Sequence, residues 1–185
     1  LARTYIERDM FSEAEVILQK LDRDPQTFES LRKDLVVAQA YLSMERKDYD
    51  KVIPPLEEAI ELSNNRSEKA RYSYIVAQIH QQEGRGDQAV ASFERALKFS
   101  PSYEMEFSSR LNVAQNAWLS GKVSSEQAIK NLEQMLKDTK NDGYEDQIYF
   151  ALAQIAIKEN DVVQAIKYLR TSLSMKTGNQ AQAAE

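Results

Sequence analysis

A five-residue phrase recurs at near-regular intervals, and this periodicity constrains the fold more than any other feature of the sequence. The phrase reads LARTY at the start of the chain, then VAQAY from Val37, VAQIH from Val76, VAQNA from Val113 and LAQIA from Leu152. Its alanines, at positions 2, 38, 77, 114 and 153, are 36, 39, 37 and 39 residues apart. A drifting period of this length is typical of stacked helical units.

A second phrase follows each copy of the first. Its five copies are SEAEVILQKL from Ser12, YDKVIPPLEEAI from Tyr49, GDQAVASFERAL from Gly86, SEQAIKNLEQML from Ser125 and VVQAIKYLRTSL from Val162. Apolar residues recur within it at three- and four-residue steps, as in Val90, Phe93 and Leu97, which is the period of an amphipathic helix. Each unit is therefore predicted to be a helix, a short turn and a second helix.

The segments between the two phrases have the composition of turns between helices. SEAE at Ser12–Glu15 and SSEQ at Ser124–Gln127 have the Ser-x-x-Glu/Gln form of a capping box, which satisfies free N–H groups at a helix start. SGK at Ser120–Lys122 and EGRGD at Glu83–Asp87 supply glycines where the chain must reverse. Aspartates that can cap a helix stand in the corresponding turns at Asp48, Asp87 and Asp161.

Composition bounds the class of protein. The 185 residues are 42% hydrophobic, enough for a packed core, and only five are glycine, which suits a helical chain. A net charge of −5, spread along the chain, gives no general attraction for nucleic acid. No apolar run of about 18 residues occurs, so we expect no membrane-spanning segment. The chain begins without methionine inside a helical pattern; we interpret it as a piece of a longer protein, which leaves room for a lipid anchor upstream.

Residue types needed for catalysis are scarce. The chain has no cysteine and one histidine, so neither a Ser-His-Asp nor a Cys-His arrangement has support. That histidine, His80, stands where other units carry Tyr5 and Tyr41, and we predict that it packs rather than acts as a base or ligand. The triplet RGD at Arg85–Asp87 matches a cell-adhesion motif, but a tight turn between two helices accounts for it. The triplet NRS at Asn65–Ser67 matches a glycosylation acceptor, but so short a pattern often arises by chance. We expect no enzyme activity, no cofactor and no metal.

These features together resemble the tetratricopeptide repeat. The clearest unit is residues 70–102, in which Ala77, Ala89, Phe93, Ala96 and Pro101 match the family's small, small, aromatic, small and proline positions. The resemblance covers about residues 1–175 and implies an all-α fold, a right-handed α-solenoid of about five helix-turn-helix repeats. The expected units are 1–24, 27–63, 66–100, 103–138 and 142–175, with 176–185 a frayed tail or the start of a further repeat.

The resemblance also implies a concave groove, lined by the first helix of each repeat, in which a protein or peptide partner binds. The family's inward positions carry over to Arg3, Ile6, Arg32, Gln39, Leu42, Arg71, Tyr74, Gln78, Gln81, Asn112, Gln115, Trp118, Phe150, Gln154, Ile157 and Lys158. The glutamines that follow the recurring alanine either hold an extended peptide backbone or bond to the neighbouring repeat. Trp118, the only tryptophan, is either an aromatic anchor for the partner or filler against the next repeat.

A narrower resemblance rests on two segments, KARYSYIVAQ from Lys69 and PSYEMEFSSRLNVAQ from Pro101. Both are similar to the repeat region of bacterial cell-envelope lipoproteins linked to gliding motility and type IX secretion. Repeat packing does not require Arg71-Tyr72 or Tyr103-Glu104-Met105. The resemblance implies a scaffold on the periplasmic side of the outer membrane that helps to assemble a secretion or motility complex; a cytoplasmic location is the alternative.

Three functions are compatible with the sequence. The first is a scaffold that binds a partner segment in the groove. The second is a structural spacer that contacts its neighbours through its ends or convex face, and the third is a regulatory appendage of an enzyme elsewhere in a longer chain. We expect protein or peptide partners and no nucleic acid, and exposed repeat ends leave room for self-association.

Overall fold

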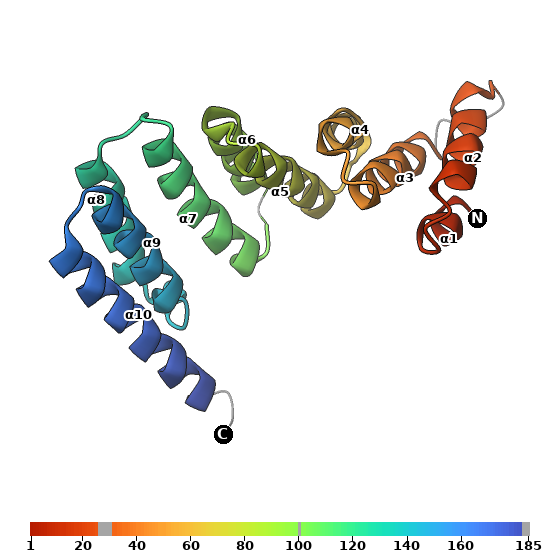
Figure 1. Ribbon diagram of the computed structural model, residues 1–185. Helices are drawn as coiled ribbons and strands as arrows, with labels where there is room; N and C mark the ends of the chain where they lie inside the picture. The colour runs from red at the N-terminus through yellow and green to blue at the C-terminus, as the bar shows by residue number, and fades with distance from the viewer. Residues whose placement is uncertain (26–30, 100, 183–185) are drawn as a thin grey trace. The chain divides into compact units, whose positions relative to one another are not determined.

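The structure, a computed structural model, describes residues 1–25, 31–99 and 101–182 (Figure 1). Within these residues it consists of ten α-helices and one 3-10 helix and contains no β-strand. The chain divides into two compact units, Leu1–Glu106 and Phe107–Glu185. The predicted all-α fold built from helix pairs is confirmed. No helix in the described part of the chain combines the length and apolarity that crossing a membrane requires.

The N-terminal unit contains three helix pairs. The first helices are α1 (Ala2–Ile6), α3 (Arg32–Glu45) and α5 (Arg66–Gln82), and the second helices are α2 (Phe11–Arg23), α4 (Tyr49–Leu62) and α6 (Gly86–Lys98). Within each pair the two helices pack together, and α2 also packs on α3 and α4 on α5 (Figure 1). Helices α2 and α4 therefore each lie between their own first helix and that of the next repeat, as in a stacked array.

The C-terminal unit continues the same pattern. It contains most of α7 (Tyr103–Leu119), then α8 (Ser125–Lys137), the 3-10 helix η2 (Thr139–Asn141), α9 (Glu145–Lys158) and α10 (Val162–Gln182). Helix α9 packs against both α8 and α10. Helix α10 runs past the expected boundary at residue 176 as far as Gln182, and residues 183–185 lie outside the described residues.

The recurring alanine of the first phrase is a packing residue. Ala77 and Ala153 are completely buried, and Ala114 is nearly so. Ala38 is half-buried against a core cluster of the first repeats. A small side chain here lets neighbouring helix backbones approach closely, and a leucine would cost about 1–3 kcal/mol in overpacking.

The turn after each first helix places one residue in the left-handed region. The φ angles are 59° at Asp9, 61° at Lys47, 71° at Gly84, 77° at Gly121 and 60° at Asn160. In four of these turns the next backbone N–H donates to the carbonyl five residues earlier, as in Arg85 N to His80 O at 2.8 Å. This hydrogen bond is the signature of the Schellman motif, which normally favours glycine. Glycine was predicted at two of these turns; the other three use an ordinary residue.

The predicted helix caps have mixed outcomes. Ser124 caps α8, because its hydroxyl accepts a hydrogen bond from Gln127 N at 3.3 Å, and Asp161 Oδ1 accepts one from Gln164 N at 3.0 Å. The capping box expected at Ser12 is wrong. The left-handed turn at Asp9 brings the chain into α2 by Phe11, so the serine already lies inside the helix.

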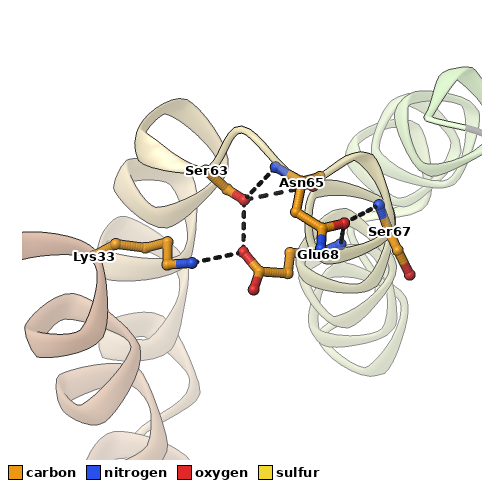
Figure 2. Close-up of polar contacts among 5 residues, drawn as sticks. All are labelled: Lys33, Ser63, Asn65, Ser67 and Glu68. Atoms are coloured by element: carbon orange, nitrogen blue, oxygen red, sulfur yellow. Dashed lines mark hydrogen bonds and ion pairs between the residues drawn. The ribbon is translucent and has the colours of Figure 1, made fainter. Parts of the chain in front are cut away.

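A polar cluster joins the second and third repeats (Figure 2). Asn65 caps α5, because its Oδ1 accepts hydrogen bonds from Ser67 N at 2.8 Å and Glu68 N at 3.3 Å. The Glu68 carboxylate in turn accepts a hydrogen bond of 2.6 Å from the hydroxyl of the buried Ser63 and pairs with Lys33 of α3. The NRS triplet is thus the start of a capped helix, which gives Asn65 a structural role.

Candidate protein-binding cleft

A cleft of about 450 Å³ opens between the first helices of three successive repeats in the N-terminal unit. Its buried residues are Ala40 of α3 and Val52 and Leu56 of α4, and these belong to one core cluster. The cleft also has Tyr41 and Met44 of α3 in its lining, both half-buried. The other lining residues are Arg3, Glu7, Val37, Arg71, Tyr72 and Ile75. The volume is within the range of about 300–1,000 Å³ found for ligand pockets.

Two exposed arginines, Arg3 from α1 and Arg71 from α5, line this cleft. Neither forms an ion pair with a carboxylate in the described residues, whereas Arg32, Arg46 and Arg95 all do. Tyr, Arg and Met are enriched at protein interfaces, and Tyr and Arg are among the residue types that most often carry the binding energy. An apolar interior with unpaired cations in its lining can therefore hold an apolar side chain and attract a carboxylate beside it.

The aromatic rings of the cleft also supply hydroxyl groups. Burial raises the pKa of Tyr72, and the nearby Glu68 carboxylate raises it further. The phenol is therefore neutral at physiological pH and can donate a hydrogen bond. Its ring contributes to the apolar lining of the cleft.

The predicted groove residues of the N-terminal unit differ in whether they line the cleft or are buried in the core. Arg3 and Arg71 line the cleft. Ile6 and Leu42 were predicted wrongly, because both are buried in a core cluster with Ala14, Leu18 and Leu35. Their aliphatic side chains fill the space between neighbouring helices, so no partner reaches them without opening the core.

Other predicted groove residues of this unit are engaged in internal contacts. Arg32 donates hydrogen bonds to Glu58 at 2.6 Å and to Asp22 at 2.5 Å, which together raise its pKa. Arg32 therefore links α2, α3 and α4. The ring of Tyr74 packs edge-on against Phe93 with 5.4 Å between centroids. The glutamines expected to form a ladder lie outside the cleft lining: Gln78 is exposed, and Gln39 and Gln81 are half-buried.

The predicted groove residues of the C-terminal unit come from α7 and α9. Gln115 Nε2 donates a hydrogen bond of 2.7 Å to Gln154 Oε1, so this pair adopts the arrangement in which glutamines of neighbouring repeats bond to each other. The Lys158 ammonium lies 5.0 Å from the centre of the half-buried Trp118 ring, a cation–π contact between α7 and α9. Asn112 Nδ2 donates to Ser108 O at 2.8 Å. The exposed apolar members are Phe150 and Ile157.

The single histidine has the environment expected of a packing residue. His80 is buried, and burial lowers its pKa, with a further lowering by the Arg85 cation and an opposing contribution from Glu57. Arg95, which also lowers this pKa, forms a bidentate pair with Glu57 at 2.6 and 2.7 Å. His80 is therefore neutral near pH 7.

The sequence signals missed several cleft residues. Tyr41 is the fifth residue of VAQAY and Tyr72 directly follows the predicted Arg71, yet neither was assigned to the groove. Met44 and Ile75 were also missed. The repeat register did not find Tyr41, because it lies three residues beyond the recurring alanine, as His80 does, and packing was predicted at this position.

A helical-repeat protein with a cleft between successive repeats is the class that this fold and site define. A family model described as the ARM repeat of tetratricopeptide repeat protein 21 matches residues 66–183, well over half of the chain. The chain belongs to this family of tetratricopeptide-like repeats, whose stacked units generally act as scaffolds for protein interactions. No curated protein sequence matches the chain significantly.

Solved structures share the fold over nearly the whole chain. The TPR-like repeats of a putative kinesin light chain from Podosopora anserina superpose with a TM-score of 0.69 at 16% identity, covering 98% of this chain and 93% of that one. MamA gives 0.68 at 15% identity, covering 98% and 97%. BtubC from P. vanneervenii gives 0.60 at 16% identity, covering 96% and 78%. At these identities the similarity establishes a repeat solenoid and nothing narrower.

Proposed function

We propose that the protein is a non-catalytic scaffold that binds a segment of a partner protein in the cleft between α1, α3 and α5. The observation that carries this proposal is the cleft itself: its interior is apolar, and its lining includes two arginines that form no ion pair with a described carboxylate. An array built only as a spacer has no need of unpaired cations around an apolar hollow. The spacer and the regulatory appendage are the alternatives that the experiment below must separate.

A peptide selection tests the cleft directly. Peptides selected from a phage-displayed random library against the folded chain would be labelled, and their Kd values measured by fluorescence anisotropy. We expect Met44→Glu with Arg71→Glu to weaken binding by about a hundredfold, as for loss of an interface hot spot. The Arg3→Ala with Arg71→Ala variant keeps Met44 and tests the charges alone, and circular dichroism checks that both fold.

Two controls locate the binding surface. Arg8→Glu reverses an exposed charge that does not line the cleft, so it should leave the Kd unchanged. Gln78→Ala with Trp118→Ala removes the main groove candidates that lie outside the cleft. Loss of binding only in the Gln78→Ala with Trp118→Ala variant would place the binding site at these two positions and not in the cleft. Equal binding by every folded variant would favour the spacer.

We further propose that the partner belongs to a bacterial envelope complex of the secretion or motility type, on the periplasmic side of the outer membrane. The support is the sequence similarity of residues 69–78 and 101–115 alone; neither the family model nor the solved structures bear on it. Membrane fractionation of the producing cell, followed by protease treatment of intact and permeabilised cells, tests the location. Recovery in the cytosolic fraction would contradict it and favour the cytoplasmic alternative.

A further inference from the structure

Helix α10 carries an exposed apolar stripe. Val162, Ile166, Leu169 and Leu173 follow one another at steps of four, three and four residues, which places them on one face of the helix. Their side chains are exposed by 64%, 46%, 38% and 64%. The helix rests on α9 through a different face, where Ala165 is buried and Ser172 Oγ donates to Asp146 O at 2.7 Å.

The residues of other repeats at the position of Leu169 show how a second helix is covered there. Leu56 of α4, Leu132 of α8 and Leu169 of α10 each lie four residues after the small or aliphatic residue in the middle of their repeat. Leu56 is 4% exposed and clusters with Val76 and Ile79 of α5, the following first helix. Leu132 is completely buried in a helix that packs on α9. The position of Leu169 is thus one that neighbouring helices cover in these sister repeats, whereas Leu169 itself is 38% exposed.

The charge of α10 indicates which kind of helix fits. The chain as a whole has a net charge of −5, yet residues 162–182 contain no Asp or Glu and three basic residues, Lys167, Arg170 and Lys176, all exposed. At 100° per residue, Arg170 falls on one side of the stripe and Lys176 on the other. The carboxylates just before the helix are engaged, since Asp161 caps α10 and Glu159 accepts a hydrogen bond from Ser125.

We propose that this face of α10 docks an amphipathic helix of a partner protein whose apolar stripe is flanked by acidic side chains. The apolar stripes pack together as helices do within the array, and the acidic flanks pair with Arg170 on one side and Lys176 on the other. A second copy of α10 is a poor occupant because it would place Arg170 and Lys176 of one copy against those of the other. This surface is distinct from the cleft, so the protein holds two binding sites.

Two designed peptides test the proposal with the intact chain. Both have the length of α10 and leucines at the a and d positions of heptads; one has glutamates at e and g, and the other has lysines there. Like charges at e and g keep each peptide from pairing with itself. In anisotropy titrations, the chain should bind the glutamate peptide at least about tenfold more tightly than the lysine peptide.

Matched variants separate the apolar from the charged contribution. Ile166→Ser with Leu173→Ser should weaken binding of the glutamate peptide by about tenfold or more. The control Val16→Ser with Leu62→Ser removes apolar side chains of similar exposure, 65% and 39%, and should change nothing. Arg170→Glu with Lys176→Glu should reverse the preference, so that the lysine peptide becomes the tighter ligand.

Several results would overturn the proposal. Equal binding of the two peptides, or binding of neither, would contradict charge-matched docking of a helix. Binding of wild-type chain to phosphatidylcholine–phosphatidylglycerol vesicles without binding to the glutamate peptide would assign the face to a membrane surface. A dimer in sedimentation velocity that Ile166→Ser with Leu173→Ser dissociates would assign it to a second copy. A folded charge-reversed variant that retains the original preference would exclude the basic side chains as the source of specificity.

Discussion

The Lys33 ammonium of α3 lies 2.8 Å from Glu68 Oε2 of α5, so the first helices of two successive repeats are joined directly, 35 residues apart. The same oxygen accepts the Ser63 hydroxyl, which belongs to the segment between α4 and α5. Residues of α3, of the joint and of α5 therefore meet at one carboxylate (Figure 2). Because α3 and α5 both line the cleft, this cluster fixes the spacing of the two helices on which the proposed site depends.

Ser63 should contribute measurably to stability. It is buried, donates to Glu68 and accepts a hydrogen bond from Asn65 N at 3.1 Å. Ser63→Ala leaves that backbone N–H without its acceptor, and we expect a loss of about 1–2 kcal/mol in the free energy of unfolding. Urea denaturation followed by circular dichroism measures it. The exposed Ser67→Ala is the control and should change stability by less than about 0.5 kcal/mol; equal losses would contradict the role of Ser63.

The same cluster predicts a pH dependence. Hydrogen bonds from Lys33 and then Ser63 hold the pKa of Glu68 below its usual value of about 4.3. A carboxylate with a lowered folded-state pKa stabilises the fold above its unfolded pKa, and this stabilisation is lost as the pH falls through the folded pKa. The stability difference between wild type and Glu68→Gln should therefore be constant above about pH 5 and shrink below about pH 4. A difference that persists unchanged at pH 3 would contradict this account.

The sequence predicted the helix pairs because small and aromatic residues at fixed repeat positions determine which faces are buried. Ala77 and Phe93 lie where that register places them. The candidate site was less predictable. Periodicity indicates the direction in which a side chain points, but not how closely the next helix approaches it. Ile6 and Leu42 have the same repeat position as the half-buried Trp118, and yet both lie in the core. The cleft depends on the distance between neighbouring helices, which the apolar pattern of one helix does not determine.

The left-handed turns predict opposite effects for two substitutions. Gly84 has a φ of 71° with open space where a Cβ would stand, so Gly84→Ala should cost about 1 kcal/mol through backbone strain alone. Lys47 occupies the equivalent turn at 61° with a side chain that must tolerate this strain. Lys47→Gly should therefore leave the thermal midpoint unchanged or raise it. A loss of stability in Lys47→Gly as large as that in Gly84→Ala would contradict this comparison.

Two equivalent leucines should differ strongly in their contribution to the core. Leu132 is fully buried whereas Leu169, at the same repeat position, is 38% exposed. Leu132→Ala should cost about 3 kcal/mol because it leaves a cavity, and Leu169→Ala less than about 1 kcal/mol. Chemical denaturation of both variants checks this. Similar losses at the two positions would mean that α10 is covered in the free protein, which would also remove the basis for its proposed docking face.

The buried histidine predicts a second pH effect, in a different range from that of Glu68. Burial, reinforced by Arg85 and Arg95 and opposed by Glu57, holds the pKa of His80 below its usual value of about 6.5. The unfolded chain then binds a proton more readily than the folded one, so stability is fully present above about pH 6.5 and falls as the pH drops below it. The slope of the unfolding free energy against pH for this one group cannot exceed about 1.4 kcal/mol per pH unit.

The variant His80→Tyr tests this account. It introduces the residue found at this position in the first two repeats, and it should remove that slope between pH 7.5 and 5 while keeping a ring in the core. Urea midpoints of wild type and variant across this range measure the difference, and parallel curves would show that His80 does not titrate between the folded and unfolded states.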